Sequence, residues 1–169
     1  MTSGFEHKNP GKMRFTGGYM RRKLFLVPII LGLLQFGAFA QSFDRITQIL
    51  DAKEINAGQL SYLAATYLNV IDERSDEKAA FDKLKEMGYF DDSFSADSPV
   101  SLKKVCAVFA RAADIKGGFM YRLTKKSERY AYKEFLARGY IPVNSDPSMH
   151  VSGANAVALF NSILEENSK

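Results

Sequence analysis

Few residues in this chain carry the side chains that enzymes use for nucleophilic or metal chemistry. The 169 residues include one cysteine, Cys106, and two histidines, of which only His150 lies beyond residue 40. Cys106 could be a reactive thiol or a small core residue, and the apolar stripe around it favours the core. Neither a Gly-x-Ser-x-Gly motif nor a phosphate-binding glycine loop is present. The sequence therefore predicts a protein that is not an enzyme and has no cofactor.

Two acidic loops contain oxygen ligands that could bind calcium. One holds Asp91, Asp92 and Asp97, and the other holds Asn144 and Asp146. Calcium takes about six to eight oxygens, commonly from acids at alternate positions with a closing glutamate. Neither loop has that spacing, so we interpret these residues as turn formers and helix caps and predict no metal site.

The remaining candidate chemistry is that of binding. Lys103 and Lys104 follow Ser101, and we expect both on the solvent side near the start of a helix. A cation there is slightly unfavourable to the helix dipole, which favours an anionic partner, although two solvated lysines are the alternative. Tyr89 and Tyr140 each follow a glycine, where a tyrosine either fills the core or lines a groove.

These candidate residues lie in a repeated segment. At a shift of 51 residues, Gly88-Tyr89 aligns with Gly139-Tyr140 and Val100-Ser101 aligns with Val151-Ser152, while Ile55-Asn56 begins a shorter copy. A period near 50 is typical of supersecondary repeats. Each copy contains two helical apolar stripes, with polar residues at the start of the second.

We therefore predict an all-α domain over residues 41–169, built from three pseudo-repeated helix–loop–helix units around a shared core. The units span about residues 43–71, 76–115 and 128–166. A longer connector is expected over residues 119–126, because Gly117 and Gly118 interrupt the helical pattern.

The unit resembles an S-layer homology motif, in which a helix ends in glycine and an aromatic residue, and an aliphatic-Ser/Thr step opens a second helix. The resemblance rests on the Gly-Tyr and Val-Ser pairs and covers most of residues 43–166. It implies a three-unit helical fold and binding of a cell-wall polymer. The family signature Thr-Arg-Ala-Glu is replaced here by Ser101-Leu102-Lys103-Lys104, Ser152-Gly153-Ala154-Asn155 and Asn56-Ala57-Gly58-Gln59. The family's arginine and acid are thus missing from all three units.

We predict that a ligand binds at the starts of the second helices and in the adjoining grooves. Helix N-termini offer unpaired N–H groups and a favourable field for anions. The candidate residues are Asn56, Ser101, Lys103, Lys104, Ser152, Asn155, Tyr89 and Tyr140.

The beginning of the chain has the three parts of a secretory signal peptide. After an extension without periodic pattern over residues 1–19, the signal peptide covers residues 20–40, with a basic start, an apolar run and Ala38-Phe39-Ala40 at its end. We expect cleavage after Ala40 and a periplasmic or secreted protein. The alternative is an uncleaved leader that anchors the protein, which would be its only contact with the membrane.

The positive charge of the chain belongs to this leader. The formal net charge is +4, but residues 1–40 hold six basic residues and one acidic residue, and residues 41–169 hold 17 basic and 18 acidic. A nucleic-acid partner is therefore not predicted. We predict a non-catalytic exported envelope protein that binds a cell-wall polymer or an envelope protein. The alternatives are a structural or assembly partner without polymer binding and, last, a small hydrolase that uses carboxylates.

Overall fold

The computed structural model describes residues 44–72, 74–124 and 127–167, which all belong to the second of two contact units, Ala40–Lys169. The predicted extension and the predicted signal peptide lie outside the described residues. Regular structure in the described ranges is helical, with two isolated β-bridges and no strand. The prediction of an all-α protein is therefore confirmed.

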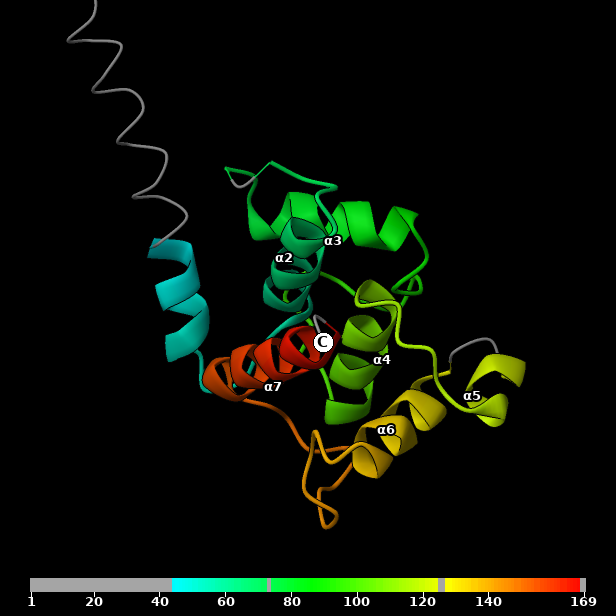
Figure 1. Cartoon of the computed structure of the whole chain (residues 1–169). Helices are drawn as coiled ribbons and strands as arrows, with labels where there is room; N and C mark the ends of the chain where they lie inside the picture. The colour runs from blue at the N-terminus through cyan, green and yellow to red at the C-terminus, as the bar shows by residue number, and fades with distance from the viewer. Residues whose placement is uncertain (1–43, 73, 125–126, 168–169) are drawn as a thin grey trace, which may run out of the picture. The chain divides into compact units, whose positions relative to one another are not determined.

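Figure 1 shows the helices in chain order. A helix over residues 44–51, drawn in cyan, precedes α2 (Ala57–Tyr67), α3 (Glu77–Glu86), α4 (Leu102–Ala112), α5 (Phe119–Leu123), α6 (Glu128–Ala137) and α7 (Gly153–Asn167). The short helix α5 lies within the longer connector that was expected over residues 119–126. Its Tyr121 ring is buried against Gly117, where a Cβ atom would lie 2.3 Å from the ring. Burial of this aromatic side chain holds the turn in place.

Helix ends lie where local signals predicted them. The Asn56 side chain accepts a hydrogen bond from the Gln59 N–H at 2.8 Å, and the Gln59 side chain accepts one from the Asn56 N–H at 3.2 Å. The two bonds form a capping box at the start of α2, as the spacing of Asn and Gln three residues apart indicates. After α3 and α6, Gly88 and Gly139 have φ angles of +76° and +74°, a conformation that favours glycine.

Backbone hydrogen bonds recur at the 51-residue shift of the sequence alignment. After the two glycines, the Tyr89 N–H donates to the Leu84 carbonyl and the Tyr140 N–H donates to the Phe135 carbonyl. In the two loops, the Phe94 N–H donates to the Asp91 carbonyl and the Ser145 N–H donates to the Pro142 carbonyl. The segments that follow α3 and α6 therefore share their backbone hydrogen bonding, although their side chains differ.

The first residues of α2, α4 and α7 each bond to a distant loop. Their N–H groups donate to loop carbonyls over 2.8 to 2.9 Å, and the pairs are Ala57 to Ser98, Leu102 to Met149 and Gly153 to Ala52. The start of α2 thus binds the loop before α4, the start of α4 binds the loop before α7, and the start of α7 binds the segment before α2. These bonds pair N–H groups that a helix leaves without intrahelical partners.

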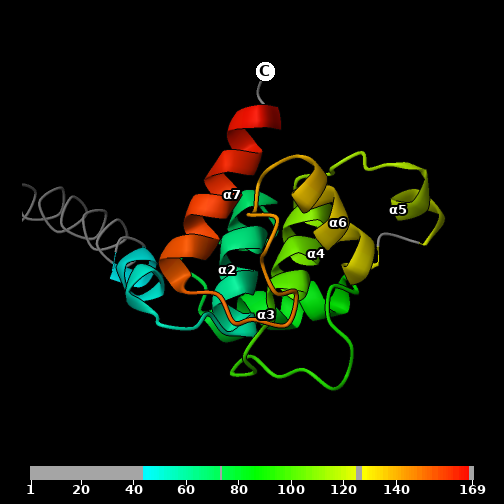
Figure 2. The same cartoon turned by 90° about the horizontal axis from the view of Figure 1, so that it is seen from below.

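The core lies between α2, α4 and α7, which Figure 2 shows side by side, with α6 next to α4. Phe109 of α4 stacks on Phe160 of α7 with 4.3 Å between the ring centroids, and these two residues are aligned by the 51-residue shift. Cys106 is fully buried, as the apolar stripe predicted. Stacked aromatic rings and close packing make this the region that holds the helices together.

Candidate functional site

The first N–H groups of two of the three predicted helix starts already have partners within the protein. At α2 and α4 the N–H groups of the first residues bond to loop carbonyls, and those of the second residues, Gly58 and Lys103, bond to Ala96 at 2.7 Å and Pro147 at 3.0 Å. The prediction that these helix starts offer unpaired N–H groups is therefore wrong. The cause is tertiary, because the acceptors come from loops about 40 residues further along the chain.

The three polar residues before these helices have structural surroundings. Asn56 forms the capping box, and Asn56 and Ser101 each take part in an isolated β-bridge. Ser101 makes no side-chain cap hydrogen bond, whereas the Ser152 hydroxyl accepts one from the Asn155 N–H at 3.3 Å. Asn56, Ser101 and Ser152 thus belong to the junction of the loops and helices.

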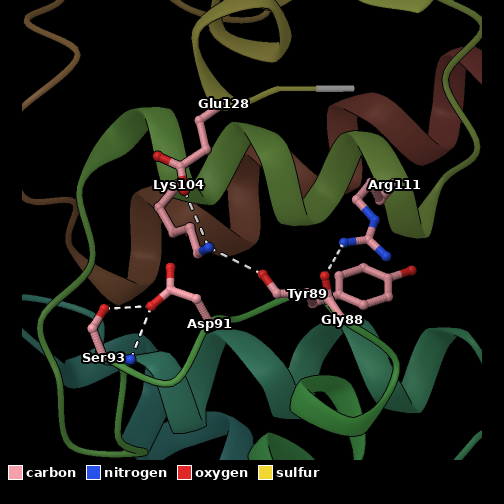
Figure 3. Close-up of polar contacts among 7 residues, drawn as sticks. All are labelled: Gly88, Tyr89, Asp91, Ser93, Lys104, Arg111 and Glu128. Carbon is pink, nitrogen blue, oxygen red and sulfur yellow. Dashed lines mark hydrogen bonds and ion pairs between the residues drawn. The ribbon is translucent and has the colours of Figure 1, made fainter. Parts of the chain in front are cut away.

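Lys104 is not on the solvent side of its helix, contrary to the prediction, whereas Lys103 is exposed as expected. The Lys104 side chain is 7% exposed, and its Nζ donates to the Tyr89 carbonyl at 3.0 Å (Figure 3). Glu128 Oε1 lies 3.1 Å from the same nitrogen. One residue along a helix turns the side chain by about 100°, so neighbouring lysines meet different environments.

Lys104 lines a groove of about 270 Å³ between α4, the segment after α3 and the start of α6. We call it the charged groove, because its ionisable side chains are Asp91, Lys104, Arg111 and Glu128, beside Tyr89. All five are drawn in Figure 3. The groove lies between two helices that the repeat assigns to successive units, and of the two alternatives for Tyr89 it is the groove that the structure shows.

Arg111 lies on the same face of α4 two turns after Lys104. Its guanidinium carbon is 3.8 Å from the centroid of the Tyr89 ring. Nη1 donates to the Gly88 carbonyl at 2.5 Å, and Nη2 donates to the Met87 carbonyl at 3.2 Å. These carbonyls end α3, where the helix carries partial negative charge, so the cation stabilises that end.

The pKa values of Tyr89 and Asp91 are shifted in opposite directions. Burial raises the pKa of the Tyr89 hydroxyl, and the charge of Arg111 offsets only part of this effect. Hydrogen bonds from the Ser93 hydroxyl and backbone N–H lower the pKa of Asp91, with a smaller effect from Lys104. Near neutral pH the groove therefore holds a neutral phenol beside an ionised carboxylate.

The bonds from Ser93 to Asp91 confirm for this residue the prediction that the loop acids form turns. Asp146 has a comparable arrangement, since it accepts hydrogen bonds from the Ser148 N–H at 2.8 Å and hydroxyl at 2.6 Å. Within the described ranges, no group of three or more His, Cys, Asp or Glu side chains is placed to hold a metal ion.

Tyr140 and Asn155 line a second groove, of about 370 Å³, between the loop after α6 and helix α7. Seven of its lining residues are those of the charged groove shifted by 51 positions. At three equivalent positions a charged side chain of the charged groove is replaced by an uncharged one. Asp91 corresponds to Pro142, Lys104 to Asn155, and Arg111 to Ser162. No charged residue lines this second groove, which we call the neutral groove.

The structure thus divides the predicted site residues into four groups. Tyr89 and Lys104 meet in the charged groove, and Tyr140 and Asn155 meet in the neutral groove. Lys103 is exposed and lines neither groove, and Asn56, Ser101 and Ser152 lie directly before the starts of α2, α4 and α7. Sequence reasoning missed Arg111 and Glu128. The spacing of seven residues from Lys104 could have indicated Arg111, because positions seven apart share a helix face.

The two remaining candidates for chemistry lie outside both grooves. Burial raises the pKa of Cys106 to about 12, which leaves the thiol protonated and unreactive. His150 Nδ1 lies 2.9 Å from Glu54 Oε2, a contact between the loop before α7 and the segment before α2. Neither residue is placed beside the charged groove.

Compared with known proteins, the chain matches no family model, no curated protein and no solved structure. Within the described ranges, no helix has both the length and the apolar character needed to cross a membrane.

Proposed function

We propose that the chain is a non-catalytic exported protein of the cell envelope that binds a cell-wall polymer in the charged groove. Export depends on the predicted signal peptide over residues 20–40. The proposed fold is three repeated helix–loop–helix units of the kind that resembles S-layer homology motifs. Two observations support this fold. The segments after Gly88 and Gly139 share their backbone hydrogen bonds, and the start of each of α2, α4 and α7 bonds to the segment that precedes another of these helices.

The observation that carries the proposal is the buried charge of Lys104. The equivalent positions in the other two units hold the neutral amides Gln59 and Asn155, so the repeated backbone does not need a cation there. Removing an ammonium group from water costs free energy, and a buried ion pair repays that cost only in part. A charge retained at such a position favours a role in recognition.

The groove offers the groups that an anionic polysaccharide needs. The Tyr89 ring provides a half-buried aromatic face, on which sugar rings pack through their C–H groups. Arg111 uses two of its five N–H donors on carbonyls, and Lys104 has two oxygen partners for three donors. The remaining donors can bind carboxylate or phosphate groups, while Asp91 and Glu128 can accept hydrogen bonds from hydroxyls.

Co-sedimentation with isolated cell-wall sacculi tests this function. The full chain is expected to sediment with sacculi and to be released as the salt concentration rises, because charged contacts are screened. Lys104→Gln introduces the residue of the equivalent position 59, so the fold should be kept while wall binding weakens about tenfold or more.

Lys103→Gln is the matched control, since it removes the same charge from the adjacent exposed position. It should change wall binding little. A wild-type protein that stays in the supernatant would exclude wall binding. Equal losses in the two variants would show that overall charge, and not the charged groove, holds the polymer.

A further inference from the structure

The segment between α4 and α6 is held by one large buried side chain. In residues 116–124, which we call the α5 strap, Tyr121 is 1% exposed, whereas Phe119, Met120 and Leu123 are 71%, 45% and 62% exposed. Figure 2 shows α5 at the edge of the molecule, beyond α6. Because the other large apolar side chains of the strap face solvent, burial of the Tyr121 ring is the main apolar contribution that holds the strap in place.

This buried side chain carries a polar group without a partner. The Tyr121 hydroxyl is shielded from water and has no hydrogen-bond partner among the described residues. In an opened strap the same hydroxyl would bond to water, so closing the strap costs the free energy of that lost hydrogen bond. The cost offsets part of the gain from burying the ring and lowers the stability of the closed strap.

The polar contacts between the strap and α6 are exposed. The Gly118 N–H donates to Glu134 Oε1 at 2.6 Å, and Arg138 Nη2 donates to the Lys116 carbonyl at 3.2 Å, both at positions where water competes for the same groups. Asp114, which has a φ angle of +44°, and Gly118 are points at which the backbone can change direction. The strap can therefore swing away without disturbing α4 or α6.

The Tyr121 side chain lies between α4 and α6, beyond the end of the charged groove. Burial raises the pKa of its hydroxyl to about 12, and the charges of Arg111 on α4 and Glu134 on α6 act on the same group in opposite directions. The charged groove is lined by Arg111 and, at the start of α6, by Glu128, but not by Tyr121. Tyr121 thus occupies the space between the two helices where the groove stops.

We propose that the α5 strap opens by local unfolding, that its opening extends the charged groove past Arg111 between α4 and α6, and that the polymer binds this open form. The closed groove of about 270 Å³ is smaller than the about 300–1,000 Å³ of most small-molecule sites, and a polymer needs a longer surface. Segments that move on binding come from the least stable parts of a protein. The opening is independent of the proposed function, whereas its effect on polymer binding rests on that function.

Hydrogen exchange of the full chain, followed by mass spectrometry of its peptides, measures the opening. Amides of the strap should exchange faster than those of α4 and α6. Tyr121→Phe removes the unpartnered hydroxyl and should slow exchange in the strap about fivefold or more. Gly117→Ala should speed it about tenfold or more, because a Cβ atom at this position would lie 2.3 Å from the Tyr121 ring. Tyr67→Phe removes the hydroxyl of a half-exposed tyrosine in α2 and should have no effect.

The direction of the Tyr121→Phe effect decides whether the strap opens in this way. Exchange in the strap that is unchanged or faster in this variant would overturn the opening, since the hydroxyl would then have a partner in solution. Exchange in α4 and α7 equal to that of the wild type shows that a faster strap in Gly117→Ala is a local effect and not a general loss of structure.

Co-sedimentation of the same variants with sacculi tests the effect on binding. If the polymer binds the open form, Gly117→Ala should bind more tightly than the wild type and Tyr121→Phe more weakly, each by about the factor found in exchange. Variants that bind as the wild type does would overturn the role of the strap and leave the proposed function intact. A wild type that does not bind would overturn the proposed function together with that role, and the exchange rates would still decide whether the strap opens.

Discussion

The charged and neutral grooves occupy equivalent positions in two segments that are 51 residues apart. Both follow a glycine with positive φ and a tyrosine, and both have a helix on one side. Their charge differs at three equivalent positions, where Asp91, Lys104 and Arg111 of the charged groove correspond to Pro142, Asn155 and Ser162 of the neutral groove. The comparison shows that one backbone arrangement supports two kinds of surface, and that a few side chains decide which of them is charged.

The largest expected effect comes from leaving the buried lysine without its acid. Glu128→Gln removes the carboxylate from Lys104 and should lower the free energy of unfolding by about 2–3 kcal/mol, because an unpaired ammonium remains in a mostly buried place. Urea denaturation measures this loss. Adding Lys104→Gln to the same chain should restore most of the stability, since the charged groove then resembles the neutral one.

The exposed pair of Lys83 and Glu86 provides the control, and Glu86→Gln should leave the urea midpoint almost unchanged. If Glu128→Gln is equally harmless, the buried ion pair does not distinguish the two grooves.

The next largest effect is expected at alkaline pH and concerns Tyr121 of α5. Burial raises the pKa of Tyr121 to about 12, and its hydroxyl has no hydrogen-bond partner. The unfolded chain loses this proton near pH 10, so the folded state holds more protons between about pH 10 and 12. Stability should fall by about 2 kcal/mol as the pH rises through that window, and it should be unaffected by this group below it.

Denaturation at pH 9 and at pH 11.5 measures the difference. Tyr121→Phe should abolish most of the alkaline loss. Tyr140→Phe, in the neutral groove, should abolish less, because the pKa of Tyr140 is raised without reaching so high a value. If Tyr140→Phe abolishes more of the alkaline loss of stability than Tyr121→Phe does, this prediction is contradicted.

The smallest expected effect concerns the shared core behind the grooves. Cys106→Val introduces the residue of the equivalent position 157 and should change the free energy of unfolding by less than about 1 kcal/mol, because the two side chains are similar in size and polarity. Thermal denaturation provides the value. The native thiol should also resist alkylation at pH 8 until the protein unfolds, and rapid modification of the folded protein would contradict its burial.

Features that depend on neighbouring residues could be predicted from the sequence. The capping box of Asn56 and Gln59, the positive φ angles at Gly88 and Gly139 and the burial of Cys106 all agree with the structure. A cap, a left-handed glycine and an apolar stripe each involve residues within a few positions of one another.

The candidate site could be predicted only in part, and Lys104 shows why. It lies at the margin of the apolar stripe of α4, where the sequence pattern alone does not distinguish a buried from an exposed position. Its environment is set by Tyr89, Phe90 and Phe94 from the segment after α3 and by Glu128 from α6. Arg111 likewise binds carbonyls more than 20 residues away along the chain.

The sequence by itself determined the helical class, the ends of several helices and the equivalence of the segments after α3 and α6, because spacing and local hydrogen bonding express these features. Only the tertiary structure decided that the helix starts bind loop carbonyls, that Lys104 is buried and Lys103 is not, and that one groove is charged and the other neutral. These outcomes depend on which distant backbone and side-chain atoms come to lie beside each residue, and that is settled when the helices pack.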